Sequence, residues 1–486
     1  MLLLHLTLAG LLASGQERAP SPAAGDVVAR AEEARRQGDL ASARRLYERA
    51  LAANPGDGRA AVGLGETLTD LGEAAAAQKL LAEVVRALPD RAEPRRALAR
   101  AYLRGGQTKE AAAEARRAVE LDQRNPEGHV ILGLASLAGG DAAGAVASLE
   151  RALALAPNDA AARRGLAGAY AALSDPRAEG AYEQAVAAEP SNLPLRVEFA
   201  EFLWRARRYD RGNAEMQRVL REAPGNAKLR LHYALNLADQ GKFRDAAEQF
   251  DAARRGGESS ADLLFYLGSA LWEVGRLEEA TARLGEAVEL APDKFEARHR
   301  LGRLLLFRGL TAEAVAELGK AARLAPGSAE VQLDLGRACE AAGRVPEAEA
   351  AYRKALELQP DLSVTHYTLG TLLARTGRRE EARSEVALYQ DYFQKAQERR
   401  FQAASRQAEL NLGWTELDAG RAGRALEQFA RHPDDPEGLR GTAAALSKLG
   451  RHTEAVQALE RALLLDPENA ALRWQLDRAR EKARTR

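Results

Sequence analysis

The chain has 486 residues, and alanine, leucine, arginine and glutamate dominate it. Only 5% of its residues are aromatic, so the composition favours helices over sheets. Its 70 lysines and arginines balance 70 aspartates and glutamates, and a net charge of zero argues against a dedicated nucleic-acid-binding protein. The single cysteine, Cys339, excludes an intramolecular disulfide and a cysteine-based metal site.

The chain begins with a nearly continuous apolar run, Met1 to Leu12. The run is too short to span a membrane, which takes about 20 residues, so we expect no membrane span. It fits the apolar core of a signal peptide over residues 1–15, with Ala13 and Gly15 near the cleavage site. We therefore expect export, to the bacterial periplasm or out of the cell, with residues 16–25 as a linker. The run lacks a preceding Lys or Arg, which leaves open a misassigned start and a cytoplasmic protein.

Glycines recur every 34 residues along most of the chain. One series is Gly38, Gly72, Gly106 and Gly140, and a second is Gly241, Gly275, Gly309, Gly343 and Gly377. The two series are out of step by one residue, and the prolines place the lost residue between Tyr170 and Ala178. A long coiled coil would instead show a seven-residue period and no regular glycines.

Two columns of small residues share this period. The eighth position of the unit carries Gly or Ala, as in Ala31, Gly65, Ala99, Gly133, Gly268, Gly302, Gly336, Gly370 and Gly413. The twentieth position does the same, as in Ala43, Ala77, Ala111, Ala145, Ala280, Ala314, Ala348, Ala382 and Ala425. Small residues at fixed positions let two helices cross closely. A glycine between the helices can adopt the left-handed conformation that ends a helix, and the proline after the second helix cannot continue it.

A 34-residue unit with these columns resembles the tetratricopeptide repeat, a pair of antiparallel helices. The resemblance covers about residues 24–469. It implies an all-α fold, a right-handed α-solenoid of about thirteen units, with units one to eleven over residues 26–385. It also implies a scaffold whose first helices line a groove that binds other proteins.

The register fails after about Arg383. Gly377 and Gly420 are 43 residues apart, nine more than a period, and residues 386–412 contain neither glycine nor proline. We therefore expect an elongated helix there, with the aromatic residues Tyr389, Tyr392 and Phe393. We expect this helix to fold back on its own solenoid and bury its apolar stripe. A partner or self-association surface at these three residues is the alternative.

The end of the chain returns to the repeat. Units twelve and thirteen occupy residues 406–469, and the second helix of unit twelve is shortened before the loop of residues 432–436. Residues 470–486 are expected to form a capping helix, with Leu472, Trp474 and Leu476 on its apolar side. A solenoid needs such a cap because its last repeat would otherwise expose a hydrophobic face.

The arrangement of reactive residues does not match an active site. The sequence has no Gly-x-x-x-x-Gly-Lys-Ser/Thr phosphate loop, no Gly-x-Ser-x-Gly nucleophile and no His-Glu-x-x-His pair. Cys339 stands at a position that holds leucine in other units, so we expect a buried thiol. We therefore expect a protein that is not an enzyme, with no catalytic residue, no cofactor and no metal.

The resemblance places positions two, five, nine, twelve and thirteen of each unit in the groove. In units eight to eleven these positions carry aromatic residues and arginines, which dominate protein-binding hot spots. The candidate partner-binding residues are Phe265, Trp272, His299, Arg303, Phe307, Arg337, Tyr367 and Arg375. Ordinary lining of the groove is the alternative. Earlier units are aliphatic or simply basic there, as at Arg96, Arg100 and Arg104.

These features predict a non-enzymatic adaptor that holds a partner protein or an extended peptide in its groove, in the bacterial periplasm or envelope. One alternative is a self-associating structural scaffold that uses residues 386–412. Another is a substrate-recognition subunit of a separate enzyme, such as a glycosyltransferase, or of a secretion complex. We expect a monomer that binds neither nucleic acid nor metal.

Overall fold

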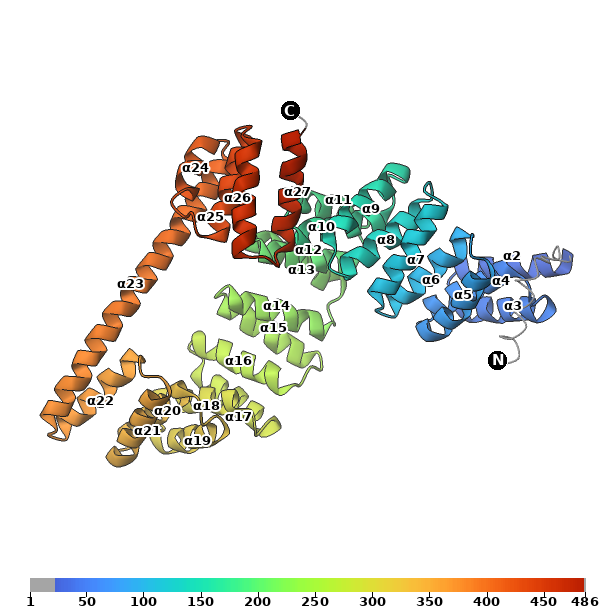
Figure 1. Ribbon diagram of the computed structural model, residues 1–486. Helices are drawn as coiled ribbons and strands as arrows, with labels where there is room; N and C mark the ends of the chain where they lie inside the picture. The colour runs from blue at the N-terminus through green and yellow to red at the C-terminus, as the bar shows by residue number, and fades with distance from the viewer. Residues whose placement is uncertain (1–21, 485–486) are drawn as a thin grey trace. The chain divides into compact units, whose positions relative to one another are not determined.

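The computed structural model describes residues 22–484, so the expected signal peptide, residues 1–15, lies outside the described residues. Between Pro22 and Arg484 the structure has 26 helices and no strand (Figure 1). The predicted all-α fold is therefore confirmed. None of the described helices is apolar over a long enough stretch to cross a membrane.

The helices form two groups by their contacts, and each group is described by itself. The first comprises residues up to Leu195 and from Pro433 onward; its helices are α2 (Pro22–Arg36), α3 (Leu40–Ala53), α4 (Gly58–Asp70), α5 (Ala74–Ala87), α6 (Ala92–Arg104), α7 (Thr108–Leu121), α8 (Pro126–Ala138), α9 (Ala142–Leu155), α10 (Ala160–Ala172), α11 (Ala178–Ala188), α25 (Pro436–Lys448), α26 (His452–Leu465) and α27 (Ala470–Arg484).

The second group runs from Arg196 to His432, so the boundary falls near the start of α12. Its helices are α12 (Leu193–Arg205), α13 (Tyr209–Glu222), α14 (Ala227–Asp239), α15 (Phe243–Arg255), α16 (Ala261–Glu273), α17 (Leu277–Leu290), α18 (Phe295–Phe307), α19 (Thr311–Leu324), α20 (Ala329–Ala341), α21 (Val345–Leu358), α22 (Ser363–Arg375), α23 (Arg379–Asp418) and α24 (Ala422–Phe429).

Each unit is a first helix packed on the second helix that follows it, such as α8 on α9 or α18 on α19. The second helix then packs on the first helix of the next unit, as α7 does on α8. This stacking is an α-solenoid. First helices of successive units also contact one another, as α6 does α8 and α18 does α20, and among the described helices no contact of similar extent joins successive second helices. Within each group the first helices therefore line the inner, concave side.

The turn inside a unit depends on a glycine with positive φ. From Gly38 to Gly450 these turn glycines have φ between 73° and 85°, a conformation that costs glycine little. Units five and six use Ser174 (φ 52°) and Arg207 (φ 58°) instead. Ser174 occupies the position of the turn glycine, so the residue missing from unit five falls after it, and α11 begins late with 11 residues where most second helices have 14.

The two helices of a unit touch at the small residue of the eighth position. A Cβ on Gly268 would lie 2.7 Å from Cγ of Leu284 and 3.2 Å from the carbonyl oxygen of Ala280. Leu284 is fully buried at this crossing. Gly302 meets Leu318 in the same way one unit later. The small residues thus set the distance between the paired helices.

The elongated helix differs from our expectation in its burial. α23 is one helix of 40 residues that acts as the second helix of unit eleven and the first helix of unit twelve (Figure 1). It does not fold back and bury its apolar stripe: Phe401 is 76% exposed, and the buried residues of α23 lie near its two ends. Without glycine or proline in its middle, α23 has no point at which the chain can reverse.

We predict opposite effects for two glycines of unit eight. Gly268→Ala should lower the free energy of unfolding by about 1–3 kcal/mol because the added methyl group overlaps Leu284. Gly285→Ala, in α17, should raise it by about 0.5–1 kcal/mol, because nothing lies within 4 Å of the new Cβ and alanine favours the helix. Thermal and urea denaturation followed by circular dichroism measure both, and equal effects would contradict the close crossing.

Candidate functional site

The eight candidate residues lie on four successive first helices of the second group. Phe265 and Trp272 are on α16, His299, Arg303 and Phe307 on α18, Arg337 on α20, and Tyr367 and Arg375 on α22. All eight stand at positions five, nine, twelve or thirteen of their units, which share one side of a helix, so these residues belong to one face of the solenoid.

Trp272 and Phe307 form an aromatic pair supported by arginines. Their ring centroids are 6.3 Å apart, and the guanidinium carbons of Arg300 and Arg303 lie 4.3 Å and 5.8 Å from the centroid of Trp272. Arg300 also forms an ion pair with Glu273 at 2.6 Å. These contacts hold the indole ring by cation–π attraction, while Phe307 remains 67% exposed.

A buried carboxylate joins three of the candidates. Asp334, on α20, accepts hydrogen bonds from His299 Nε2 (2.9 Å) and from Arg337 (3.1 Å), and Arg303 Nε lies 3.4 Å from it. Burial by itself would raise the pKa of the Asp334 carboxyl, but the His299 hydrogen bond and the arginine charges outweigh it and hold the pKa below its ordinary value. Asp334 therefore stays ionised and fixes Arg303 and Arg337.

His299, Glu330 and Asp334 bring possible metal-ligating atoms within 4.8 Å of one another. Their surroundings do not suit a cation, because Arg303 and Arg337 already contact Asp334 and add two positive charges. The cluster is an ion-pair network that positions arginines.

Asp334 and Arg300 were not among the residues predicted from the sequence, although both stand at the sixth position of their units. A signal was present in that column. It is mostly Ala and Gly in the first five units and then becomes Glu198, His232, Tyr266, Arg300 and Asp334. Large polar residues at a position that faces the preceding unit indicate contacts between units.

Tyr367, on α22, is the first of a row of aromatic residues that continues along α23. Its ring centroid lies 5.2 Å from that of Tyr389, which lies 5.5 Å from that of Phe393. Tyr392 stacks on His366 at 5.5 Å. Tyr389 and Tyr392 are thus half-buried on α22, and of the three residues proposed for self-association only Phe393 is largely exposed.

The remaining candidates have other partners. Phe265 packs edge-on against Tyr266, with the ammonium of Lys294 5.5 Å from its ring centroid. Arg375 forms an ion pair with Glu340 at 2.5 Å, and Glu340 also accepts a hydrogen bond from the Tyr352 hydroxyl. The structure therefore joins five candidates, Trp272, His299, Arg303, Phe307 and Arg337, through direct contacts and their shared partner Asp334.

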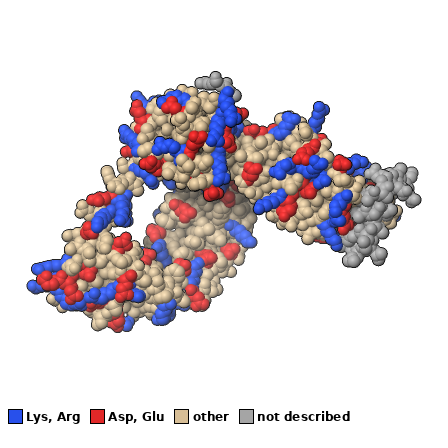
Figure 2. All heavy atoms as spheres, in the orientation of Figure 1, with Lys and Arg blue, Asp and Glu red and all other residues tan. Residues whose placement is uncertain are grey.

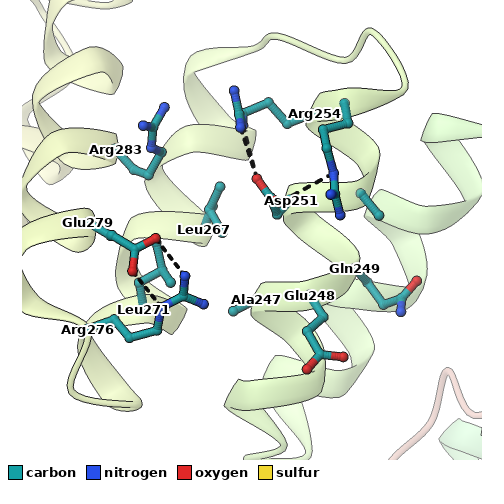
Figure 3. Close-up of a pocket in the computed structure, with 12 residues that line it drawn as sticks. Ala247, Glu248, Gln249, Asp251, Arg254, Leu267, Leu271, Arg276, Glu279 and Arg283 are labelled. Atoms are coloured by element: carbon teal, nitrogen blue, oxygen red, sulfur yellow. Dashed lines mark hydrogen bonds and ion pairs between the residues drawn. The ribbon is translucent and has the colours of Figure 1, made fainter.

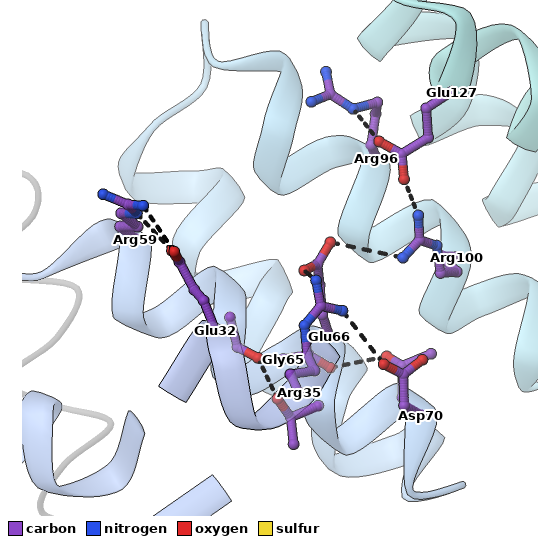
Figure 4. Close-up of polar contacts among 12 residues, drawn as sticks. Glu32, Arg35, Arg59, Gly65, Glu66, Asp70, Arg96, Arg100 and Glu127 are labelled. Carbon is purple, nitrogen blue, oxygen red and sulfur yellow. Dashed lines mark hydrogen bonds and ion pairs between the residues drawn. The ribbon is translucent and has the colours of Figure 1, made fainter. Parts of the chain in front are cut away.

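The first helices of units one to four differ from the simply basic surface that we expected. Glu66 pairs with Arg35 at 2.6 Å and lies 3.7 Å from Arg100, and Glu127 bonds to both Arg96 and Arg100 (Figure 4). The arginines are neutralised by acidic residues of the neighbouring units. Figure 2 likewise shows basic and acidic side chains interspersed over the visible surface.

A cleft of about 450 Å³ lies between α15 and α17, over Leu267 and Leu271 of α16. Its charged groups pair within their own helices: Arg254 bonds to Asp251, and Arg276 bonds to Glu279 (Figure 3). The cleft is formed by second helices, so it is separate from the face that carries Phe307 and Tyr367.

Cys339 is buried on α20, as expected, and burial raises the pKa of its thiol. A buried thiol with a raised pKa is a poor nucleophile. It packs as a small apolar residue.

Models of the tetratricopeptide repeat match residues 34–97, 96–160, 234–295, 299–363, 363–387 and 443–469. The chain belongs to the tetratricopeptide repeat family. These matches include α16, α18, α20 and α22, which carry the candidate site. No curated protein matches the chain.

Solved structures of other repeat proteins match part of this tetratricopeptide protein. YrrB, described as a tetratricopeptide repeat protein with an unusual peptide-binding site, is 23% identical, covers 38% of this chain and 96% of its own, and gives a TM-score of 0.35. MamA of Desulfovibrio magneticus is 22% identical over 35% of this chain and 96% of its own, with a TM-score of 0.34. A thermophilic repeat protein of Thermus thermophilus is 26% identical over 37% and 98%, with a TM-score of 0.33. Likenesses of this extent do not identify a ligand.

We predict that Asp334→Asn lowers the free energy of unfolding at neutral pH by about 1–3 kcal/mol, because charge-assisted hydrogen bonds are lost. The pKa of Asp334 is lowered in the folded protein, so its stabilisation is complete above the ordinary pKa of 3.8 and is lost as the pH falls through the lower folded-state pKa. The difference from wild type should therefore shrink below about pH 4.

Urea denaturation at neutral and acid pH measures this difference. Glu330→Gln is the matched control, because that carboxylate is exposed and lies 3.5 Å from Arg303, and its effect should be under about 1 kcal/mol. A difference for Asp334→Asn that persists unchanged at acid pH would contradict the role of the charge.

Proposed function

We propose that this protein is a non-enzymatic scaffold that binds an extended segment of a partner protein along α16, α18, α20 and α22. The repeat family and the α-solenoid support the general role of a protein-interaction scaffold. The finer proposal rests on one observation: Phe307 and Tyr367 are large aromatic residues on concave first helices, and they remain 67% and 50% exposed.

The aromatic side chains are held in place before a ligand arrives. Phe307 rests against Trp272, which two arginines hold, and Tyr367 rests against Tyr389. A side chain that is already fixed loses little entropy on binding, so more of its buried area contributes to affinity. Phe307 and Tyr367 stand two units apart, so one ligand that contacts both is extended.

Arginines between the aromatic residues favour a ligand with acidic groups. Asp334 fixes Arg303 and Arg337, and both guanidinium groups remain partly exposed. An arginine fork can bind a carboxylate through two parallel hydrogen bonds. The first helices of units one to four offer a different surface, because their arginines also pair across successive units but none of their described aromatic residues is largely exposed.

We predict that the double variant Phe307→Ala, Tyr367→Ala loses its partners in a pull-down followed by mass spectrometry. Removing two exposed anchors should weaken binding by about 2 kcal/mol or more, roughly thirtyfold in Kd. The matched control is Leu290→Ala, which removes an equally exposed apolar side chain from the second helix α17. Equal recovery of the same partners by all three proteins would remove this face as the binding site.

The same pull-down addresses the role of the partner. If the retained partner is an enzyme, the scaffold acts as its substrate-recognition subunit. Partners that lack catalytic activity support an adaptor of a larger assembly.

We also propose that the protein is exported through residues 1–15, and that it works in the bacterial periplasm or outside the cell. The apolar run from Met1 to Leu12 and the small residues after it support this proposal. N-terminal sequencing of the protein from its native source should find a chain that starts near Gln16, and a chain that retains Met1 would contradict export.

A further inference from the structure

An unfilled cleft of about 430 Å³ lies at the end of unit eleven, between α22 and α23. Small and apolar residues line most of it, with two arginines at one edge. The lining residues are Gly370, Thr371, Ala374, Arg379, Ala382, Arg383, Val386, Ala387 and Gln390. Such a lining can accept the side of a helix.

The same repeat positions accept the next first helix in other units. Val386 stands at the position of Leu149, which packs against Gly165 of the next unit: a Cβ there would lie 3.1 Å from it. Ala374 stands at the position of Leu137, which lies 3.4 Å from the Cβ position of Gly168. The cleft is therefore the acceptor site for the first helix of a following unit.

Unit twelve cannot fill this site within the same chain. Its first helix is the second half of α23, and the second helix of unit eleven is the first half. Gln394 stands where Pro360 ends the preceding unit, so the helix continues instead of turning back. Two halves of one straight helix cannot pack side by side.

The second half of α23 leaves its own matching face open. Ala408, Leu412 and Thr415 stand at the third, seventh and tenth positions of unit twelve and are exposed, Leu412 by 46%. The equivalent residues of unit eleven, Thr365, Leu369 and Leu372, are buried. Units eleven and twelve are thus consecutive in the repeat, yet the cleft of one and the matching helix face of the other both remain uncovered.

The repeat register states which residues of the two faces would meet. In earlier units position 28 packs against position 3 of the next unit, as Val119 does against the Cβ position of Gly128 (3.2 Å). Position 21 reaches position 10 of the next unit, as in the hydrogen bond from Gln78 to the carbonyl oxygen of Ala101 (3.1 Å).

On α23 these rules pair Gln390 with Ala408 and Arg383 with Thr415. Both pairs are centred on Arg399, which is also at the middle of α23. A second helix and the next first helix run antiparallel. If two copies of α23 are related by a two-fold axis level with Arg399, Gln390 of each copy therefore meets Ala408 of the other. Arg383 of each copy likewise meets Thr415 of the other.

We propose that two copies of this chain pair through antiparallel α23 helices, so that the first helix of unit twelve of each copy fills the cleft at the end of unit eleven of the other. Each copy gives the same helix to the other, so the exchange produces a closed dimer with a two-fold axis. It covers the two solenoid ends that α23 leaves open, as solenoid ends require. The pairing is independent of the ligand face on α16 to α22, and it replaces the monomer expected from the sequence.

The middle of α23 supports the same pairing. Phe393, Gln397, Phe401 and Ala404 follow the helical period on the face that contains Val386 and Ala408. Phe393 and Phe401 are 44% and 76% exposed in one copy, and the pairing covers them. About the same axis, Glu398 of each copy stands level with Arg400 of the other.

Cysteine cross-linking tests the register. In the double variant Gln390→Cys, Ala408→Cys, oxidation should give a covalent dimer. The two positions of one chain are 18 residues apart on one helix, about 27 Å at 1.5 Å per residue, too far for a disulfide within the chain. Each single cysteine variant should run as a monomer on a non-reducing gel, because the cysteine of one chain and the same cysteine of the other chain lie at opposite ends of the helix pair. Native Cys339 is buried and does not compete.

Light scattering of the full chain tests the pairing itself. The wild type should have twice the chain mass, and Ala404→Arg should raise the dimer Kd at least tenfold by placing a charge on the paired face. Gln402→Arg is the matched control, because Gln402 is exposed on the other side of α23 and its variant should stay dimeric. A monomeric wild type overturns the proposal, whether α23 bends or another protein's helix fills the cleft. A dimer that the double cysteine variant fails to cross-link overturns it as well.

Discussion

The close crossing of the two helices in each unit is the contact on which the rest of the structure depends. Gly268, Gly302 and Gly336 leave no room for a Cβ, because Leu284, Leu318 and Tyr352 fill the space. The crossing fixes the distance and the angle between first and second helices. It therefore also fixes which side of every first helix faces the next unit and which side faces the groove. The side chains at fixed positions along the chain become rows in space for this reason.

The groove face shows how this constraint is used. Contacts between successive units hold two of the candidate binding residues: Arg300 of one unit stacks on Trp272 of the unit before it, and Asp334 fixes Arg303 from the following unit. The first helices of units one to four form ion pairs among themselves from positions two, five, nine and twelve instead. The same arrangement of helices thus presents paired charges on the first helices of units one to four and exposed aromatic residues on those of units eight to eleven.

Stacking also creates the need for a neighbour, since each unit buries its second helix only under the next first helix. α23 interrupts this rule, because it joins two units end to end and leaves Val386 and Leu412 without the packing that their equivalents have. The two open faces are complementary because the same repeat register produced them. In the proposed dimer, a second copy of the chain provides the first helix that the straight α23 keeps away from the cleft.

The sequence alone determined the repeat, its helical pairs, the small-residue crossing and the site of the elongated helix, because these follow from local propensity and from a period that is visible in one dimension. It also placed Phe307 and Tyr367 on first helices. Only the tertiary structure showed Asp334 as the shared partner of His299 and two arginines, since contacts between units depend on side-chain reach and not on spacing. The direction of α23 was likewise decided in three dimensions. An apolar stripe predicts that a helix packs against something. It does not show whether the same chain can reach that stripe to cover it.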